Sequence, residues 1–278
     1  MPKIRLALLL ACLLIPIGAA ATAPEVILVC YPGGAVNAKD ANGAMSSMLH
    51  VVERVGGWQA ESFASQFTTD LDDCRNWMAE KHPKFAIISL GLFLELRTQS
   101  HLEPLVQPRI KGRTSEQYRI IVQKDKFRNL EELKGKTLGG TVLKEDAFIQ
   151  RIVLAGKLDP ATFFSLKPTN QAIRALRSLD KGELDAVILN EQQYAGLSAL
   201  SMQSTVAAIF TSESIPLMGV AADSAKTNAD ERGRFAKGVE GLCTDAEGKK
   251  LCDLFGIDSF VKAESGVFDP MVKLWGRK

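Results

Sequence analysis

The chain has 278 residues, and its 34 Lys and Arg residues nearly balance its 32 Asp and Glu residues. Such a balance provides neither a positive field that attracts nucleic acids or anionic membranes nor an acidic bias, so ligand selectivity must arise at a local site. The length is enough for one or two domains with sizeable cores.

The N-terminus has the pattern of a secretory signal peptide. Lys3 and Arg5 precede an apolar segment, residues 6–17, and Ala21-Thr22-Ala23 has the small-x-small pattern that signal peptidase cleaves. We therefore predict that residues 1–23 are a signal peptide. The mature protein would carry 32 basic and 32 acidic residues and would be periplasmic or secreted.

Two further features of this segment concern membrane attachment. The apolar run is shorter than the ~20 residues of a membrane-spanning helix, so we do not expect the mature protein to span a membrane. Leu9-Leu10-Ala11-Cys12 resembles a lipobox, and lipidation of Cys12 therefore stays open as a route to a membrane anchor.

The first part of the mature chain alternates between apolar runs and segments with helical spacing. Near-continuous apolar runs predict buried strands, and apolar residues three and four positions apart predict helices. We predict a strand at 25–31, a helix at 42–55, a strand at 58–67, a helix at 69–81 and a strand at 85–90. This alternation indicates an α/β fold with a parallel sheet, in which ligands bind at the carboxyl ends of the strands.

The alternation resumes in the second half of the chain. Strands are predicted at 118–124, 137–140, 163–166, 185–189, 206–210 and 217–222. Helices are predicted between 166 and 185, at 228–242 and at 269–275.

Two motifs in this half carry a family resemblance: LEELKGKT at 130–137 and, about fifty residues later, KGELDAVIL at 181–189. Together they resemble the second lobe of type 2 periplasmic binding proteins, most of all the phosphate/phosphonate-type substrate-binding proteins of ABC importers. The resemblance implies two lobes, each a mostly parallel sheet flanked by helices, joined by crossing segments near 111–117 and 211–216. Lobe 1 would comprise residues 24–113 and 214–278, and lobe 2 residues 114–213.

The resemblance also implies a function. Proteins of this family capture a small molecule in the cleft between their lobes by a hinge motion and hand it to a membrane permease. We therefore expect an extracytoplasmic solute-binding protein that acts as a monomer with an ABC permease as its partner. A binding module without transport, such as a periplasmic ligand sensor or an accessory protein, is the alternative.

In the family, loops that follow the strands of both lobes clamp the ligand. Carried over to this chain, the ligand contacts would be Tyr31, Gly33, Gly34, Ser89, Gly91, Thr141, Asn190 and Ser212. For four of these residues a structural role is an open alternative. Tyr31 would cap the sheet edge, Gly33-Gly34 would form an ordinary turn, and Asn190 would cap a helix.

The chain departs from the family at the anion site. Phosphonate-type binders resemble one another in a cluster of Ser and Thr hydroxyls after the strand that follows the Lys-Gly-Lys turn, whereas here only Thr141 brings a hydroxyl. Glu145 and Asp146 would also repel an anion, and Lys144 offsets only one of them. Phosphate or phosphonate is therefore a minority interpretation. A less charged, partly apolar molecule would fit the apolar residues near the strand ends, Leu90, Leu92, Phe93, Val142 and Leu143.

Four cysteines remain in the mature chain, and an even number in an oxidising compartment favours disulfides. Cys243 and Cys252 flank a turn-like segment, so two short helices joined there could be bridged. Cys30 and Cys74 would form the second pair, with burial as two small apolar groups as the alternative. No CxxC pair or matching His spacing indicates a metal site.

Enzymatic activity is not expected. His50, His82 and His101 are widely spaced and match no zinc-site or catalytic-triad pattern. The chain has no GxSxG, HExxH or GxxxxGK[ST] motif, and we expect no cofactor.

Overall fold

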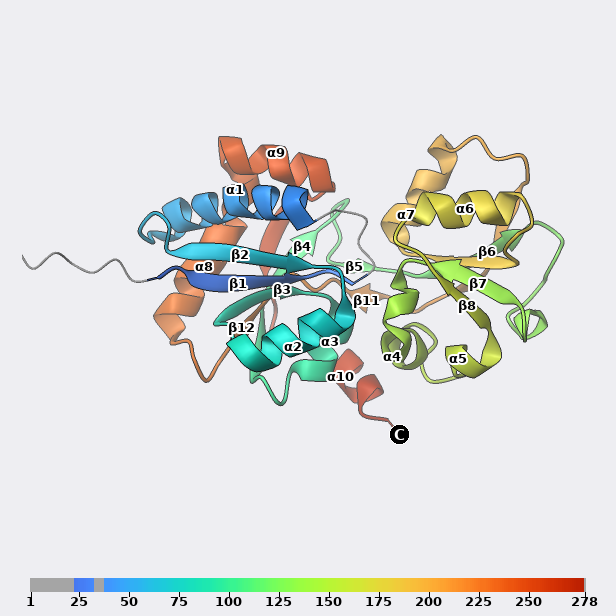
Figure 1. The fold of residues 1–278 in the computed structure, drawn as a ribbon, viewed down its shortest axis with the longest axis horizontal. Coiled ribbons are helices and arrows are strands. Elements are labelled where there is room, and N and C mark those ends of the chain that lie inside the picture. The colour runs from blue at the N-terminus through green and yellow to red at the C-terminus, as the bar shows by residue number, and fades with distance from the viewer. Residues whose placement is uncertain (1–22, 33–37, 278) are drawn as a thin grey trace, which may run out of the picture.

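The computed structural model describes residues 23–32 and 38–277, which form two lobes side by side (Figure 1). The six-stranded lobe combines the N-terminal and C-terminal parts of the chain, and the five-stranded lobe is built from the middle part. This confirms the predicted α/β class and the two-lobed architecture. The predicted signal peptide, apart from Ala23, lies outside the described residues, as does Cys12.

The sheet of the six-stranded lobe has the order β13-β4-β12-β3-β1-β2. Its strands are β1 (Glu25–Cys30), β2 (Phe63–Thr68), β3 (Phe85–Ile88), β4 (Leu102–Arg109), β12 (Val220–Asp223) and β13 (Ser259–Lys262). β1 pairs parallel with both β2 and β3, whereas β12 pairs antiparallel with β3 and β4. β13 closes the far edge, antiparallel to β4.

Helices cover both faces of this sheet (Figure 1). They are α1 (Ala38–Gly56), α2 (Leu71–Lys81), α3 (Leu90–Leu96), α8 (Ala229–Glu240), α9 (Ala246–Phe255) and α10 (Asp269–Trp275). Successive residues of β1 show the two layers. Ile27 packs in a core with Phe235 of α8, and Leu28 packs in another core with Met78 of α2. Burial on both faces explains why β1 is an apolar run without alternation.

The sheet of the five-stranded lobe has the order β10-β6-β9-β7-β8. Its strands are β6 (Arg119–Gln123), β7 (Thr137–Gly140), β8 (Ser165–Pro168), β9 (Ala186–Leu189) and β10 (Val206–Thr211). β7 lies parallel to both β8 and β9, and β6 pairs antiparallel with β9 and β10.

The helices of this lobe are mostly short. They are α4 (Asp146–Phe148), which continues into a π-helical turn (Ile149–Val153), α5 (Pro160–Phe163), α6 (Ala172–Asp180) and α7 (Glu191–Ala195). Short 3-10 turns lie at Glu131–Leu133, Val142–Lys144 and Gly196–Ala199, and in the other lobe at Leu242–Thr244. Leu176 and Leu179 of α6 pack on one face of the sheet against Val187. Phe148 packs on the other face with Ile188.

Two short strands run between the sheets. β5 (Ser115–Glu116) and β11 (Ile215–Pro216) pair with each other, antiparallel. They fall within or at the end of the crossing segments expected near 111–117 and 211–216. The Ser212 hydroxyl accepts a hydrogen bond from the Tyr118 amide (2.9 Å), which adds a second link between the two crossings.

Differences from the predicted elements have local causes. The strand predicted at 85–90 ends at Ile88, because Ser89 caps α3 and accepts a hydrogen bond from the Leu92 amide (3.2 Å). β4 was not predicted because Pro removes a ladder donor, and β4 contains Pro104 and Pro108. The register shifts beside Pro104, a bulge of the kind that tolerates Pro.

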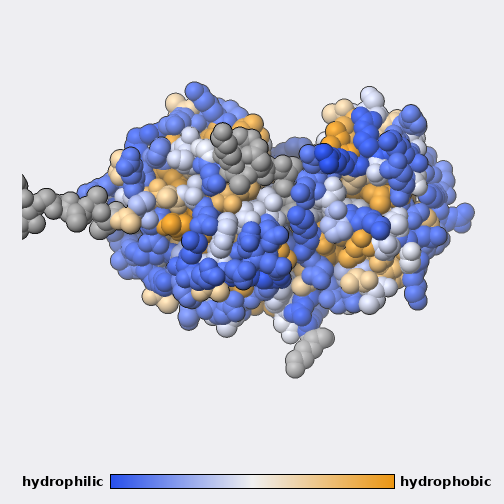
Figure 2. Space-filling model, in the orientation of Figure 1, coloured by the Kyte–Doolittle hydropathy of each residue, from blue (hydrophilic) through white to orange (hydrophobic). Residues whose placement is uncertain are grey.

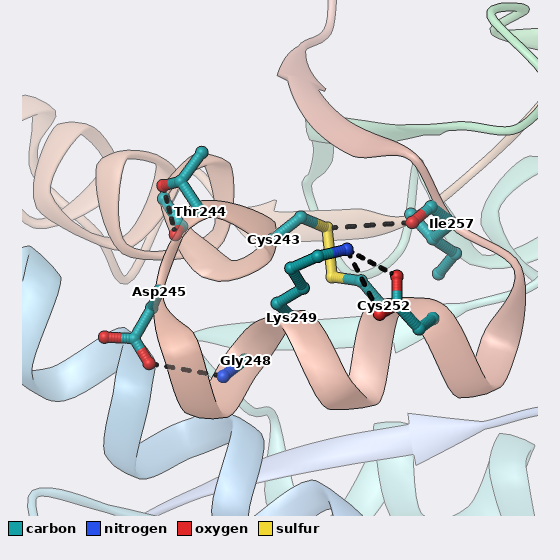
Figure 3. The surroundings of a disulfide bond; sticks show 9 residues. Cys243, Thr244, Asp245, Gly248, Lys249, Cys252 and Ile257 are labelled. Carbon is teal, nitrogen blue, oxygen red and sulfur yellow. Dashed lines mark hydrogen bonds and ion pairs between the residues drawn. A yellow bond between two sulfur atoms is a disulfide. The ribbon is translucent and has the colours of Figure 1, made fainter.

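The disulfide between Cys243 and Cys252 is confirmed (Figure 3). The 3-10 turn at Leu242–Thr244 meets the start of α9, and the side chain of Asp245 turns the chain by accepting hydrogen bonds from the Glu247 and Gly248 amides (3.0 and 3.2 Å). The two cysteine Cα atoms therefore lie 5.6 Å apart.

The predicted pairing of Cys30 with Cys74 is wrong for this structure, in which both are free thiols. Cys30 ends β1, Cys74 lies in α2, and they are 1% and 0% exposed within one apolar core. A hydrogen bond with Cys30 raises the pKa of the Cys74 thiol above its usual range, and burial raises it further. These thiols match the alternative of small buried apolar groups.

Replacing both bridged cysteines (Cys243→Ser with Cys252→Ser) should destabilise the protein. A bridge across 9 positions removes loop-closure entropy worth about 2–3 kcal/mol from the unfolded chain. We expect the melting temperature to fall by roughly 5–10 °C, measured by calorimetry under non-reducing conditions. Wild-type protein treated with a reductant is the control and should melt near the variant; equal melting of the variant and oxidised wild type would contradict a stabilising bridge.

Candidate functional site

The strand ends of the two lobes face one another. Ser89 follows β3 in the six-stranded lobe, and its hydroxyl donates a hydrogen bond to the carboxylate of Glu145 (2.7 Å), which follows β7 in the five-stranded lobe. Because ligands of α/β sheets bind where parallel strands end, this gap is the candidate ligand site.

Gly91 allows this contact. It lies in the first turn of α3, and a Cβ built on it would collide with the Glu145 carboxylate and lie 3.0 Å from Cβ of Phe148. Any larger residue would therefore push the carboxyl group away from the Ser89 hydroxyl. Gly91 was predicted as a ligand contact, and here it provides close approach between the lobes.

Glu145 is a buried carboxyl group, with 8% of its surface exposed. Burial raises the pKa of Glu145 to about 7, and the nearby Glu95 carboxylate acts in the same direction. The hydrogen bond from Ser89 opposes the shift. Glu145 therefore changes charge close to neutral pH.

Tyr31 stands at the edge of the same gap, directly after β1. It exposes 58% of its surface, yet protein atoms surround its phenol closely enough that burial raises its pKa, followed by the charges of Glu116 and Glu145. Tyr31 therefore lies near both carboxyl groups, and its role as a ligand contact stays a prediction.

Glu116 and Tyr118 belong to the crossing region and were not predicted. The Tyr118 hydroxyl donates to the Glu116 carboxylate (3.0 Å), and the Tyr118 ring packs edge-on against Phe148, with ring centroids 5.6 Å apart. Burial raises the pKa of Glu116 to about 7, and the Glu191 carboxylate adds to the shift. Polar residues are ordinary in crossing segments, so nothing in the sequence distinguished these two.

On the five-stranded side, Thr141 and Asn190 are linked through Gln193. The Gln193 side chain donates to the Thr141 hydroxyl (3.0 Å) and accepts from the Asn190 amide (3.2 Å), while the Asn190 side chain accepts from the Gln193 amide (2.9 Å). Asn190 therefore caps α7 in a capping box, the alternative considered from the sequence. The Asn-x-x-Gln spacing was the signal that could have identified Gln193.

Of the remaining predicted ligand contacts, Ser212 is bonded within the protein and the two glycines are not described. Ser212 is 4% exposed, and its hydroxyl donates to the Glu213 carbonyl (2.7 Å) while accepting from the Tyr118 amide, so it holds the crossings together. Gly33 and Gly34 lie outside the described residues.

The apolar lining expected for the ligand is not where it was predicted. Among those five residues, Val142 is half-buried against the core, and the other four are buried within it: Leu90, Leu92, Phe93 and Leu143. α3 begins at Leu90 and turns these side chains inward, instead of leaving an open loop after β3. Apolar side chains of both lobes belong to one buried cluster, which includes Phe93 of the six-stranded lobe and Phe148 of the five-stranded lobe.

Further contacts hold the lobes together on either side of the gap. Arg151, after α4, donates to the Trp275 carbonyl of α10 (2.9 Å) and stacks on the Trp275 ring, 5.2 Å from its centroid. On the opposite side, the Gln192 side chain of α7 donates to the Phe255 carbonyl at the end of α9 (3.4 Å). The arrangement is that of a cleft with its lobes in contact.

Gly91→Ala should disturb the contact between the lobes. The added methyl group collides with the Glu145 carboxylate, and overpacking of this kind costs about 1–3 kcal/mol. We expect a lower melting temperature in thermal unfolding. The matched control is Gly43→Ala, in an exposed part of α1 where a Cβ meets nothing within 4 Å and should be neutral or stabilise by up to about 1 kcal/mol. Equal stability of the two variants would show that Gly91 is not needed for close approach.

Several solved structures have a similar fold. A binding component of an ABC phosphonate transporter from Pseudomonas aeruginosa is 16% identical, with 91% of this chain and 86% of that chain covered and a TM-score of 0.68. A methylphosphonate complex from Prochlorococcus marinus is 13% identical, with 90% and 97% covered and a TM-score of 0.62. An ATP-bound Xanthomonas citri protein is 11% identical, with 90% and 96% covered and a TM-score of 0.67. At these identities the likeness shows the fold.

The family is shown by the sequence itself. A family model described as "ABC transporter, phosphonate, periplasmic substrate-binding protein" matches residues 37–266. No curated protein sequence matches the chain. Within residues 23–32 and 38–277, no helix is both long and apolar enough to cross a membrane. The chain therefore belongs to the family of periplasmic phosphonate-type substrate-binding proteins, which bind solutes for ABC importers and are not enzymes.

Proposed function

We propose that this protein binds a neutral or positively charged solute, rather than a phosphonate, in the cleft between its lobes and delivers it to an ABC permease. One observation carries the choice of solute. The carboxyl group of Glu145 lies in the cleft against Ser89 and Gly91, where a bound anion would meet it. A second carboxyl group, that of Glu116, lies near Tyr31 in the same gap.

Electrostatics supports this choice. The carboxyl groups of Glu145 and Glu116 repel an anion when they are ionised, and a bound anion would force them to take up protons. A positive charge or a hydrogen-bond donor would instead compensate their burial. The phosphonate and nucleotide named for similar structures are ligands of those proteins, whose identity to this chain is 16% or less.

We further propose roles for the predicted contacts. Tyr31, Ser89 and Thr141 would face the solute, as would Gly33 and Gly34, which follow Tyr31 in the sequence, and Gly91 would act indirectly by making room for Glu145. Asn190 and Ser212 would act indirectly, since their side chains already hold α7 and the crossing segments. Lobe boundaries at 113/114 and 213/214 would place the hinge at the paired strands β5 and β11.

We also propose that the protein is a monomer. On the face shown in Figure 2, hydrophilic residues predominate and apolar residues are scattered among them. The large apolar side chains that are exposed lie in separate elements or in short pairs: Tyr31, Ile173, Leu254 and Phe255. A stable oligomer would normally bury a broader apolar patch.

Phosphate and methylphosphonate should not stabilise the mature protein. A ligand specific for the native state raises the melting temperature by mass action, so at millimolar concentration either anion should shift it by no more than about one degree. Sodium chloride at equal ionic strength is the control for salt effects. The same assay should find stabilising compounds among neutral solutes and organic amines. Saturable stabilisation by methylphosphonate would overturn the proposed solute class.

A further inference from the structure

The hydrogen bond between Ser89 and Glu145 connects the two lobes without a solute. Its donor lies in the six-stranded lobe, its acceptor in the five-stranded lobe, and the two oxygens are 2.7 Å apart. Glu145 is 8% exposed, and the missing side chain of Gly91 makes room for its carboxyl group. The contact is thus buried and closely fitted, unlike an exposed ion pair. We call this hydrogen bond the clasp.

Among the described residues, the one cation whose charge acts on the pKa of Glu145 is already engaged by other carboxylates. Arg75 of α2 is the nearest contributor, but its guanidinium already binds the carboxylates of Glu95 (2.7 and 3.1 Å) and Asp72 (2.9 Å). Glu95 of α3 itself repels Glu145. The other titratable groups that sense its charge are neutral near pH 7: Tyr31 after β1, Cys74 of α2 and Tyr118 before β6.

We propose that the clasp is controlled by a proton: a neutral Glu145 holds the lobes together without solute, and an ionised Glu145 favours their separation. A neutral carboxyl group loses little when it leaves water, whereas a carboxylate loses its hydration, which the hydrogen bond from Ser89 replaces only in part. Opening of the lobes returns Glu145 to water. The inference rests on the proposed cleft but not on the identity of the solute.

The sign of the pH dependence follows from the pKa of Glu145. Burial raises it to about 7 with the lobes in contact, and in separated lobes it returns toward the ordinary value of 4.5. Closure therefore takes up a proton between these values. The stabilisation of the closed state is fully present below about pH 4.5 and is lost as the pH rises through about 7.

Small-angle scattering of the solute-free mature protein tests the clasp directly. We expect a larger radius of gyration at about pH 8.5 than at about pH 5.5, by roughly 1 Å, because hinge opening separates the lobes. Glu145→Gln imitates the neutral acid and keeps an acceptor for Ser89, so it should stay compact at both pH values. Ser89→Ala removes the donor and should be extended at both. Circular dichroism confirms that each variant is folded.

Two control variants separate the clasp from other titrations. Asp146→Asn removes an exposed neighbouring charge whose side chain bonds only to the adjacent Ala147 amide. Glu116→Gln removes the other carboxyl group of the cleft, whose pKa is also raised to about 7 but whose hydrogen-bond partner, Tyr118, lies two positions away in the same crossing segment and not in the opposite lobe. Both controls should keep the pH response of the wild type.

Three results would overturn the inference: a radius of gyration that does not change with pH, a Glu145→Gln variant that opens as the wild type does, or a response that Glu116→Gln abolishes. None of them depends on solute binding. If scattering shows no clasp, the proposed solute class is still tested by thermal shift. If thermal shift contradicts that solute class, the scattering result on the clasp still stands.

Discussion

The carboxyl group of Glu145, buried where the two lobes meet, is the constraint to which the rest of the cleft is fitted. Its contact with Ser89 requires a glycine at position 91, since any side chain there would occupy the space of the carboxyl group. It also requires that the segments after β3 and β7 face each other. Parallel pairing places each segment at the carboxyl edge of its own sheet, and the packing of the two lobes brings these edges together. Arg75, the nearest cation, is held by other carboxylates, so Glu145 keeps a raised pKa.

The proposed solute site gives the family's scaffold a different chemistry. The family and the fold are those of phosphonate-type binding proteins. The polar groups that reach the gap are instead two carboxyl groups and two tyrosine hydroxyls, with Thr141 engaged by Gln193. Fold alone does not determine the solute, because specificity lies in the side chains at the strand ends.

Most of the fold could be predicted from the sequence, and the limits of prediction are physical. Apolar runs such as β1 report burial on both faces, and the turn near Asp245 indicated a bridge between Cys243 and Cys252. β4 was hidden by its prolines, and the Ser89 cap turned an expected loop into α3. The apolar residues of that helix were therefore assigned to the cleft when they belong to the core.

The site was harder to predict because it depends on contacts across the chain. The repulsion of anions by Glu145 follows from its place after a strand, but its partner Ser89 lies 56 positions away and becomes visible only in three dimensions. Glu116 and Tyr118 lie in a polar crossing segment, and only the structure brings them beside Tyr31.

Native mass spectrometry of the purified protein tests the central claim most directly. The account predicts a co-purified small molecule that is neutral or positively charged, and a protein that carries phosphate or a phosphonate, or no solute at all, would contradict it.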